Sequence, residues 1–227
     1  MRILVTRARQ DAALTAARLQ ALGHEPVLAP VLEIMPLEFV WPQKPRVLVA
    51  TSAHAFIKPL PADWHGLPLY VVGETTARAA AQVGFTRHVF VRGDVGDLAA
   101  LLSGSDRSGA LYLAAKHRKP ILETAFPGLA VLETYEAHAC DHLPDDALDQ
   151  LKSNRIGVVL HYSRRSAEIF VRLIRQHNIN LAKLVATHIC LSRDVAVPLQ
   201  IQAFDGTSAL RVKIAASPDE ASLMDLI

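Results

Sequence analysis

The chain has 227 residues, of which 51% are apolar and 20% charged, a globular composition that excludes a fibrous or disordered chain. Its 24 Lys and Arg residues against 22 Asp and Glu residues leave a formal net charge of +2, too weak to favour nucleic acid or an anionic membrane as the main partner. At about 150 residues per domain, the length allows one large domain or two small ones.

Short apolar runs alternate with helix-period stretches from the amino terminus onward. A strand at residues 3–5, a helix at 11–22 and a strand at 27–29 come first, with Gly23 in the helix C-cap position. A strand–helix–strand unit this short indicates parallel strands joined by a right-handed crossover. Further strands are predicted at 47–50, 69–72, 89–91, 111–113, 131–134, 157–160, 185–190 and 211–215, and further helices at 74–83, 97–102, 166–176 and 219–226.

Ten strands alternating with helices predict an α/β fold in which parallel sheets are covered by helices on both faces. Two segments depart from this rhythm, at about 33–40 and 132–139. Both are mixed in polarity, look extended and are followed by no predicted helix. We therefore expect these two segments to have a separate structural role.

The chain also contains an internal repeat. Segments 47–56, 70–80 and 93–102 match segments 158–170, 189–199 and 217–227 in the same order. Three matches in one order, offset by 111 to about 125 residues, indicate duplication of one α/β unit.

The repeat and the two extended segments together predict the domain organisation. Five strands lie between the extended segments and five lie outside them. The simplest topology is a discontinuous domain, residues 1–34 and 139–227, with a continuous domain, residues 37–134, inserted into it. The extended segments then run side by side as a two-stranded β connector.

Hydroxyls, a glycine and cations follow the predicted strands. Ligands of open parallel sheets bind beyond the carboxyl ends of the strands, and these residue types suit an anion. The same residues are equally typical of ordinary helix N-caps, so both interpretations stay open. The candidate binding residues are Thr6, Arg7, Thr51, Ser52, Gly73, Thr75, Thr76, Lys116, Arg118, Ser163, Arg164 and Ser192.

Several kinds of site are disfavoured because their motifs are missing. No G-x-G-x-x-G and no P-loop pattern occurs, which argues against dinucleotide and P-loop chemistry. The ten histidines show no H-E-x-x-H spacing and the two cysteines no C-x-x-C spacing, so no dedicated metal site is expected. No G-x-S-x-G elbow supports a hydrolase. His54 and His161 lie at matching strand ends, where a structural role is the commoner one.

Cysteine usage and hydropathy predict the compartment. Cys140 and Cys190 are too few for a disulfide framework, so a reducing environment is expected. The amino terminus lacks the pattern of a secretion signal, and no apolar run reaches the length of about 18 residues needed to span a membrane. We expect a soluble, cytoplasmic protein with no membrane partner.

The motifs, taken in order, resemble those of the uroporphyrinogen-III synthase family. The resemblance extends from residue 2 to about 226, and its specificity lies in the order and spacing of the motifs rather than in any single one. The motifs are ILVTRARQ at residues 3–10, VLVATSAHAF at 47–56, YVVGETTARAAAQVGF at 70–85, GDVGDLAALL at 93–102, LYLAAKHRKPIL at 111–122 and ETYEA at 133–137.

The resemblance implies two flavodoxin-like α/β domains joined by a two-stranded connector. It implies a cofactor-free enzyme that closes hydroxymethylbilane into uroporphyrinogen III, with loss of water and inversion of ring D. The family binds this substrate between its domains, through main-chain amides and hydroxyls that meet the substrate carboxylates. A monomer is implied, with a transient contact to the preceding enzyme of the pathway as a further expectation.

The resemblance also carries over individual residues. Six of the candidate turn residues fall on family motif positions: Thr51, Ser52, Gly73, Thr75, Thr76 and Ser163. Tyr135 falls on the family's recurring tyrosine, which is often proposed to assist departure of the hydroxyl. The turn at residues 192–195 departs from the family pattern, because it lacks both threonines.

Elementary chemistry is consistent with this interpretation. The work of such an enzyme is to orient the chain for ring closure, which requires few titrating groups. A tyrosine with a pKa of about 10 is protonated at neutral pH and suits donation of a hydrogen bond to the leaving hydroxyl. The alternative from another class is a two-domain sensor that binds an anionic small molecule without chemistry. A sugar-nucleotide transferase is disfavoured by the length and by the lack of an acidic metal motif.

Overall fold

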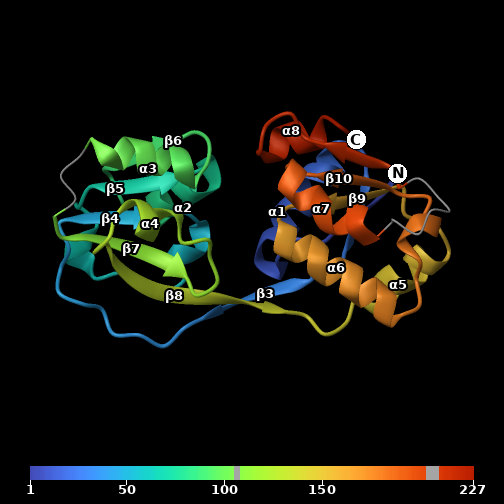
Figure 1. The fold of residues 1–227 in the computed structure, drawn as a ribbon, viewed down its shortest axis with the longest axis horizontal. Helices are drawn as coiled ribbons and strands as arrows, with labels where there is room; N and C mark the ends of the chain where they lie inside the picture. Colours follow the sequence, from blue (N-terminus) through green and yellow to red (C-terminus); the bar gives the residue numbers. More distant parts are fainter. Residues whose placement is uncertain (105–107, 203–209) are drawn as a thin grey trace. The chain divides into compact units, whose positions relative to one another are not determined.

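The computed structural model describes residues 1–104, 108–202 and 210–227. Contacts divide the chain into two compact units: unit 1 comprises Met1–Glu33 and His138–Ile227, and unit 2 comprises Ile34–Ala137. Each unit contains one sheet with helices on both of its faces (Figure 1). The predicted α/β class with parallel sheets is confirmed.

The sheet of unit 1 has five parallel strands in the order β11-β10-β9-β1-β2. Numbered along the chain within the unit, this is the flavodoxin-like order 2-1-3-4-5. The strands are β1 (Arg2–Val5), β2 (Glu25–Leu28), β9 (Val158–His161), β10 (Thr187–Cys190) and β11 (Val212–Ile214). The helices are α1 (Arg9–Ala21), α5 (Asp145–Lys152), α6 (Arg164–Gln176), α7 (Arg193–Gln202) and α8 (Glu220–Met224), with a short 3-10 turn at η3 (Leu181–Lys183).

Helix α1 illustrates why these residues fold as they do. Ala12, Thr15 and Leu19 recur at helical spacing and are the buried positions of the helix. The helix ends at Ala21 with Leu22 as its C-cap residue, one position before the predicted Gly23, whose φ of +79° is a conformation that glycine adopts without strain. One face of the sheet packs against α1 and α8, where Leu223 is fully buried. On the other face the fully buried Phe170 of α6 lies against the strands.

The sheet of unit 2 has six strands in the order β3-β8-β7-β4-β5-β6. Its strands are β3 (Leu32–Pro36), β4 (Val47–Ala50), β5 (Leu69–Val72), β6 (His88–Val91), β7 (Ala110–Ala115) and β8 (Ala130–Ala139). Its helices are α2 (Glu74–Gln82), α3 (Val95–Ser103) and α4 (Ile121–Ala125), with 3-10 turns at η1 (Ala53–Phe56) and η2 (Ala62–Trp64). The boundary between the units crosses β3 and β8.

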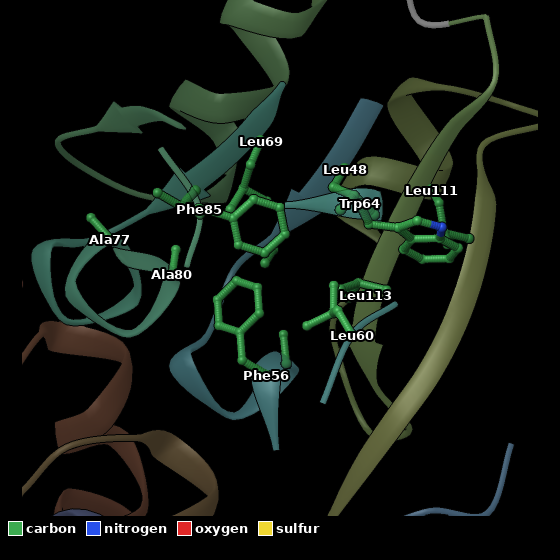
Figure 2. Packing of buried hydrophobic residues seen from close by; sticks show 13 residues of the cluster. Leu48, Phe56, Leu60, Trp64, Leu69, Ala77, Ala80, Phe85, Leu111 and Leu113 are labelled. Atoms are coloured by element: carbon green, nitrogen blue, oxygen red, sulfur yellow. The ribbon is translucent and has the colours of Figure 1, made fainter. Parts of the chain in front are cut away.

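Aromatic side chains fill one face of the unit 2 sheet. Figure 2 shows the rings of Phe56 and Phe85 facing each other between the strands and α2, with centroids 5.9 Å apart. Trp64 packs in the same cluster and is 2% exposed. The opposite face packs against α3 and α4 through Leu98 and Leu122. Each unit therefore has a hydrophobic core of its own.

The two sheets have the same spatial order once the sequence repeat is applied. Leu48 pairs with Leu69 in unit 2, and Val159 pairs with His188 in unit 1, as the predicted offsets require. Strands β4, β5 and β6 thus correspond to β9, β10 and β11, while β7 and β8 correspond to β1 and β2. The units are circular permutations of one arrangement, because the chain begins unit 1 at the place that β7 holds in unit 2.

Local pattern missed three helices, α4, α5 and α7. Helix α7 contains Pro198 in its interior, where proline removes a backbone donor and sequence rules place a helix end. Helix α4 spans only five residues and is too short to show a period. Helix α5 begins after Pro144, which is its N-cap residue and forms no side-chain cap, so no typical N-cap residue marks its start.

Candidate functional site

The candidate turn residues lie at the carboxyl edge of the sheet in their own unit. In unit 2 the chain extends from β4 to β6 on one side and then continues with β7 and β8 on the other, so the topological switch point lies between β4 and β7. By the same reasoning the switch point of unit 1 lies between β9 and β1. Ligands of such sheets bind beyond the carboxyl ends of the strands at the switch point.

At the switch point of unit 2, Thr51 follows β4 and meets a tyrosine from β7. The Thr51 Oγ1 and Tyr112 Oη atoms lie 2.8 Å apart in a hydrogen bond. Burial raises the pKa of the Tyr112 phenol, and the nearby charge of Glu123 adds to the effect. Tyr112 is not among the predicted site residues, because it lies in the apolar run of a buried strand, where a tyrosine is usually a packing residue.

The amino terminus of α2 offers unoccupied backbone donors. Gly73 is its N-cap residue, with a φ of +80°, and no side chain of the described residues caps the helix. Thr75 is exposed in the first turn, whereas Thr76 is buried. Helices α3 and α6 differ, because a capping box closes each of them. The first turn of α2 is therefore suited to bind an anionic oxygen.

Tyr135 lies in β8 next to a β-bulge. Ala114 pairs with Glu133 but Ala115 pairs with Tyr135, which leaves Thr134 as the extra residue. The bulge places Thr134 and Tyr135 both inside, and the Thr134 hydroxyl is buried with no hydrogen-bond partner among the described residues. The Tyr135 residue is 7% exposed, and its ring centroid lies 5.7 Å from that of His54.

Ser52, which precedes His54, has a local partner. Its side-chain oxygen accepts a hydrogen bond from His54 N at 3.3 Å and so caps η1. The same holds in unit 1, where Ser163 accepts from Ser166 N at 3.1 Å and caps α6. Both serines therefore fit the N-cap interpretation, and the Ser163 hydroxyl also donates to Ser166 Oγ at 2.9 Å.

The basic run after β7 contacts the chain's own carboxylates. Lys116 Nζ lies 3.2 Å from Glu136. Arg118 contacts Glu123 at 2.6 Å and Glu133 at 2.9 Å. Lys116 and Arg118, which the sequence predicted as ligand contacts, are thus paired with carboxylates of unit 2 itself.

In unit 1, two further candidates are engaged in the fold. Thr6 is fully buried, and its hydroxyl donates to the Leu160 carbonyl at 2.7 Å, which ties β1 to β9. Arg164 lies 3.0 Å from Glu168 and 3.2 Å from Asp194, both exposed pairs. Exposed pairs of this kind contribute little to stability. Ser192 is half-buried in the turn between β10 and α7.

Arg7 is held in an ion-pair network rather than presented to solvent. Its Nη1 atom lies 3.0 Å from Glu220 of α8, and its Nη2 atom lies 3.4 Å from Asp11. Its guanidinium carbon lies 4.4 Å from the centre of the Tyr162 ring. Burial and the charge of Glu220 raise the pKa of Tyr162, which stays protonated. Sequence separation hid this network, because Arg7 and Glu220 are 213 residues apart.

His161 has a structural role in the core of unit 1. Its Nε2 atom lies 2.9 Å from Nδ1 of His188, and both residues are fully buried. Burial lowers the pKa of His161 well below its ordinary value and that of His188 to about 4. Both rings are therefore neutral, and one donates its N–H to the other. The remaining ring nitrogen of each histidine has no partner among the described residues.

The described part of the chain contains no cluster of three or more His, Cys, Asp or Glu side chains that could hold a metal ion. Within the same residues, no helix is long and apolar enough to cross a membrane.

Known proteins resemble this chain in sequence pattern and in fold. The family profile described as uroporphyrinogen-III synthase HemD matches residues 13–204, well over half of the chain. A crystal structure of uroporphyrinogen-III synthetase from Helicobacter pylori is 19% identical, with a TM-score of 0.65 and coverage of 100% of this chain and 98% of the other. A mutant uroporphyrinogen III synthase from the extremely thermophilic bacterium Thermus thermophilus is 17% identical, with a TM-score of 0.54 and coverage of 100% and 97%. The search of curated proteins matched none.

Proposed function

Because the chain belongs to the uroporphyrinogen-III synthase family, we infer that it closes hydroxymethylbilane into uroporphyrinogen III, with loss of water and inversion of ring D. The observation that carries this conclusion is the family match over residues 13–204. The activity is that of a cofactor-free cyclising lyase in haem biosynthesis. The match lends no support to the alternative of a sensor without chemistry.

The reaction itself places modest demands on acid–base groups. The terminal pyrrole of the substrate expels hydroxide to form an electrophilic azafulvene. Closure without an enzyme joins the nearest unsubstituted carbon and leaves ring D uninverted. The protein must hold the chain so that the substituted carbon attacks and a spiro intermediate forms. Catalysis of this kind comes mainly from orientation, which requires many fixed contacts to the substrate carboxylates.

We propose that the first turn of α2 supplies such contacts in unit 2. The uncapped helix start at Gly73 and the exposed hydroxyl of Thr75 support this role. Thr51 and Ser52 add hydroxyls at the same carboxyl edge. Backbone amides and hydroxyls are neutral donors, so a polyanionic substrate is held without a basic protein. This explains how a net charge of only +2 is compatible with such a substrate.

We propose that Tyr135 donates a hydrogen bond to the leaving hydroxyl. Its position directly after the bulge in β8 supports this role, because bulges recur next to active sites and redirect side chains. The contact of its ring with His54 restricts the orientation of the phenol. The phenol is a poor general base at neutral pH, and as a protonated group it suits donation of a hydrogen bond to the leaving hydroxyl.

We also propose that the protein works as a monomer in a reducing compartment, the cytoplasm. The two cysteines support the compartment, because Cys140 and Cys190 are both free thiols. Light scattering of the purified chain measures the mass directly, and a dimer mass contradicts the proposed monomer. Contact with the preceding enzyme of the pathway is tested by mixing the two proteins in the same measurement.

The isomer assay tests the function. The purified protein is mixed with freshly prepared hydroxymethylbilane, and the porphyrinogens are oxidised and separated by isomer type. We expect the type III isomer, against the type I isomer in a control without protein. Type I alone in both samples rejects the synthase activity.

The substitution Tyr135→Phe tests the role of the tyrosine. We expect kcat to fall by roughly tenfold to a hundredfold, toward the lower end of what one positioned acid contributes, because hydroxide leaves with little help. The melting temperature should stay within about 2 °C. Tyr70→Phe is the matched control, since Tyr70 lies in β5 and is partly buried against the core of the same unit. Equal rates for the two variants remove Tyr135 from this role.

A further inference from the structure

The Glu220 carboxylate lies at the switch point of unit 1, where a flavodoxin-like sheet binds its ligand. Arg7 follows β1 and Tyr162 follows β9, and these two strands border the switch point. Both residues contact Glu220, which begins α8. A side chain of the protein itself therefore occupies the place at which this topology accepts a ligand.

Four donors converge on this one carboxylate. Its Oε1 atom accepts from Arg7 Nη1 at 3.0 Å, Thr15 Oγ1 at 2.6 Å and Tyr162 Oη at 3.2 Å. Its Oε2 atom accepts from Arg18 Nη1. A carboxylate has about four acceptor sites, so the donors match it in number, with three on Oε1 and one on Oε2. Two of the donors carry a full positive charge, which makes the set selective for an anion over a neutral amide.

The donors are held firmly by the fold. Thr15 is fully buried, and the Arg7 and Glu220 side chains are 19% and 15% exposed. The ring of Tyr162 lies against the Arg7 guanidinium and fixes its plane. Arg7 Nε is buried and has no hydrogen-bond partner among the described residues, so one more donor remains. The pocket is thus preorganised around a carboxylate.

Unit 2 differs at the corresponding place. Its helix α3 corresponds to α8 and begins with Val95, which has no carboxylate. The carboxylate at the switch point is therefore a property of this side chain and does not follow from the shared topology. In α8, Leu223 is fully buried in the core and anchors the helix. The packing of α8 therefore depends on Leu223 and not on the Glu220 carboxylate.

We propose that Arg7, Thr15, Arg18 and Tyr162 form a carboxylate-binding site, which Glu220 occupies when no ligand is bound. The ligand is a carboxylate on a short alkyl arm, of the acetate or propionate type. Two sources share this chemistry: the side chains of the tetrapyrrole substrate and a free small carboxylate. The first source rests on the proposed function, and the second does not.

Chemical complementation tests the site without any assay of activity. In Glu220→Ala the pocket is empty, and sodium propionate should raise the melting temperature by about 3–6 °C at tenfold excess over its dissociation constant. Sodium chloride of equal ionic strength and neutral propionamide should not. The wild type and Glu25→Ala are the controls, since Glu25 is an exposed ion-paired acid of the same unit. Absence of a propionate-specific shift overturns the site.

Kinetics of Glu220→Gln distinguish the two sources and cover the case in which Glu220→Ala does not fold. A neutral amide competes less with an incoming carboxylate, so the KM for hydroxymethylbilane should fall about threefold to tenfold if the site takes a substrate side chain. A propionate shift in Glu220→Ala with an unchanged KM in Glu220→Gln assigns the site to a free carboxylate. An unchanged or raised KM without a propionate shift overturns the proposal.

The melting experiment also separates this proposal from the proposed function. If the wild type forms only the type I isomer, the synthase activity fails while a propionate shift still supports the site. If the type III isomer forms and neither variant responds as expected, the site fails and the function stands.

Discussion

Units 1 and 2 have one sheet arrangement in common but stabilise it with different chemistry. In unit 2 the switch point holds a neutral pair, Thr51 with Tyr112, and the core is apolar and aromatic. In unit 1 the switch point holds the ion pairs of Glu220, and the core contains the pair His161 and His188. The strand order therefore depends on the apolar strands, whereas polar side chains at equivalent positions are free to diverge.

The register makes this divergence specific. With the offsets of the repeat, Ala50 of unit 2 corresponds to His161 of unit 1, and Leu69 corresponds to His188. Unit 2 thus has small and apolar residues where unit 1 has two neutral imidazoles. The difference predicts that the two units respond differently to mutation and to acid, and both tryptophans lie in unit 2, so their fluorescence reports on that unit alone.

The largest expected effect is that of a cavity in unit 1. Phe170→Ala should lower the free energy of unfolding by about 3–5 kcal/mol, because the ring is fully buried and contacts both histidines. In urea, the midpoint from far-UV circular dichroism should fall, while the tryptophan midpoint stays. Phe90→Ala is the control, since Phe90 is 36% exposed. Equal shifts in both signals contradict separate cores.

Acid should also destabilise unit 1 first. The pKa of His188 is about 4 in the folded chain against about 6.5 when unfolded, so the unfolded chain binds more protons in acid. The stability contribution is complete above pH 6.5, falls as the pH drops toward 4, and amounts to about 3 kcal/mol. Circular dichroism should change before tryptophan fluorescence in a titration from about pH 7.5 to about pH 4.5.

The control for this titration is a variant of unit 1 in which the two buried histidines are replaced by the corresponding residues of unit 2. The double variant His161→Ala, His188→Leu places no titratable group at these positions, and its unfolding should lose most of its dependence on pH in this range. A variant as sensitive to acid as the wild type shows that other groups cause the loss.

The next variant places a residue of unit 1 into unit 2 and tests the role of Gly73. Gly73 corresponds to Ser192, and Gly73→Ser places a side chain on a backbone with φ +80° and ψ 144°. We expect the free energy of unfolding to fall by about 1–3 kcal/mol because of backbone strain. A steric clash does not contribute, since an added Cβ meets no atom within 4 Å. Thermal unfolding by fluorescence measures the loss. Thr75→Ser, in the same turn, should be neutral for stability, and equal losses in both variants contradict the role of φ.

The smallest effect compares the two serine caps. Ser163→Ala should cost about 1 kcal/mol, because it opens the capping box of a 13-residue helix. Ser52→Ala should cost less, about 0.3 kcal/mol, since η1 has four residues and its cap bond is 3.3 Å long. Urea unfolding of both variants gives the two values. A larger loss for Ser52→Ala than for Ser163→Ala contradicts the comparison.

The sequence predicted where the candidate site residues lie, but not which of them are already paired with other groups of the protein. The turn residues follow their strands because a parallel sheet brings its carboxyl ends to one edge, and that rule needs only the chain order. Whether a side chain there is available depends on distant partners. Arg118 meets Glu133 from the next strand, and Thr6 meets Leu160 across 154 residues. Glu220 was missed for the same reason, whereas Tyr112 was missed because it lies in the apolar run of a buried strand.

The sequence by itself determined the α/β class, the repeat and the family resemblance, because strand and helix periods and ordered motifs are local properties of the chain. Only the tertiary structure decided which polar groups meet. The His161 and His188 pair, the bulge that turns Tyr135 inward and the donors around Glu220 all depend on strand register and helix packing. These contacts join segments that no local pattern relates, so their energies arise only once the chain is folded.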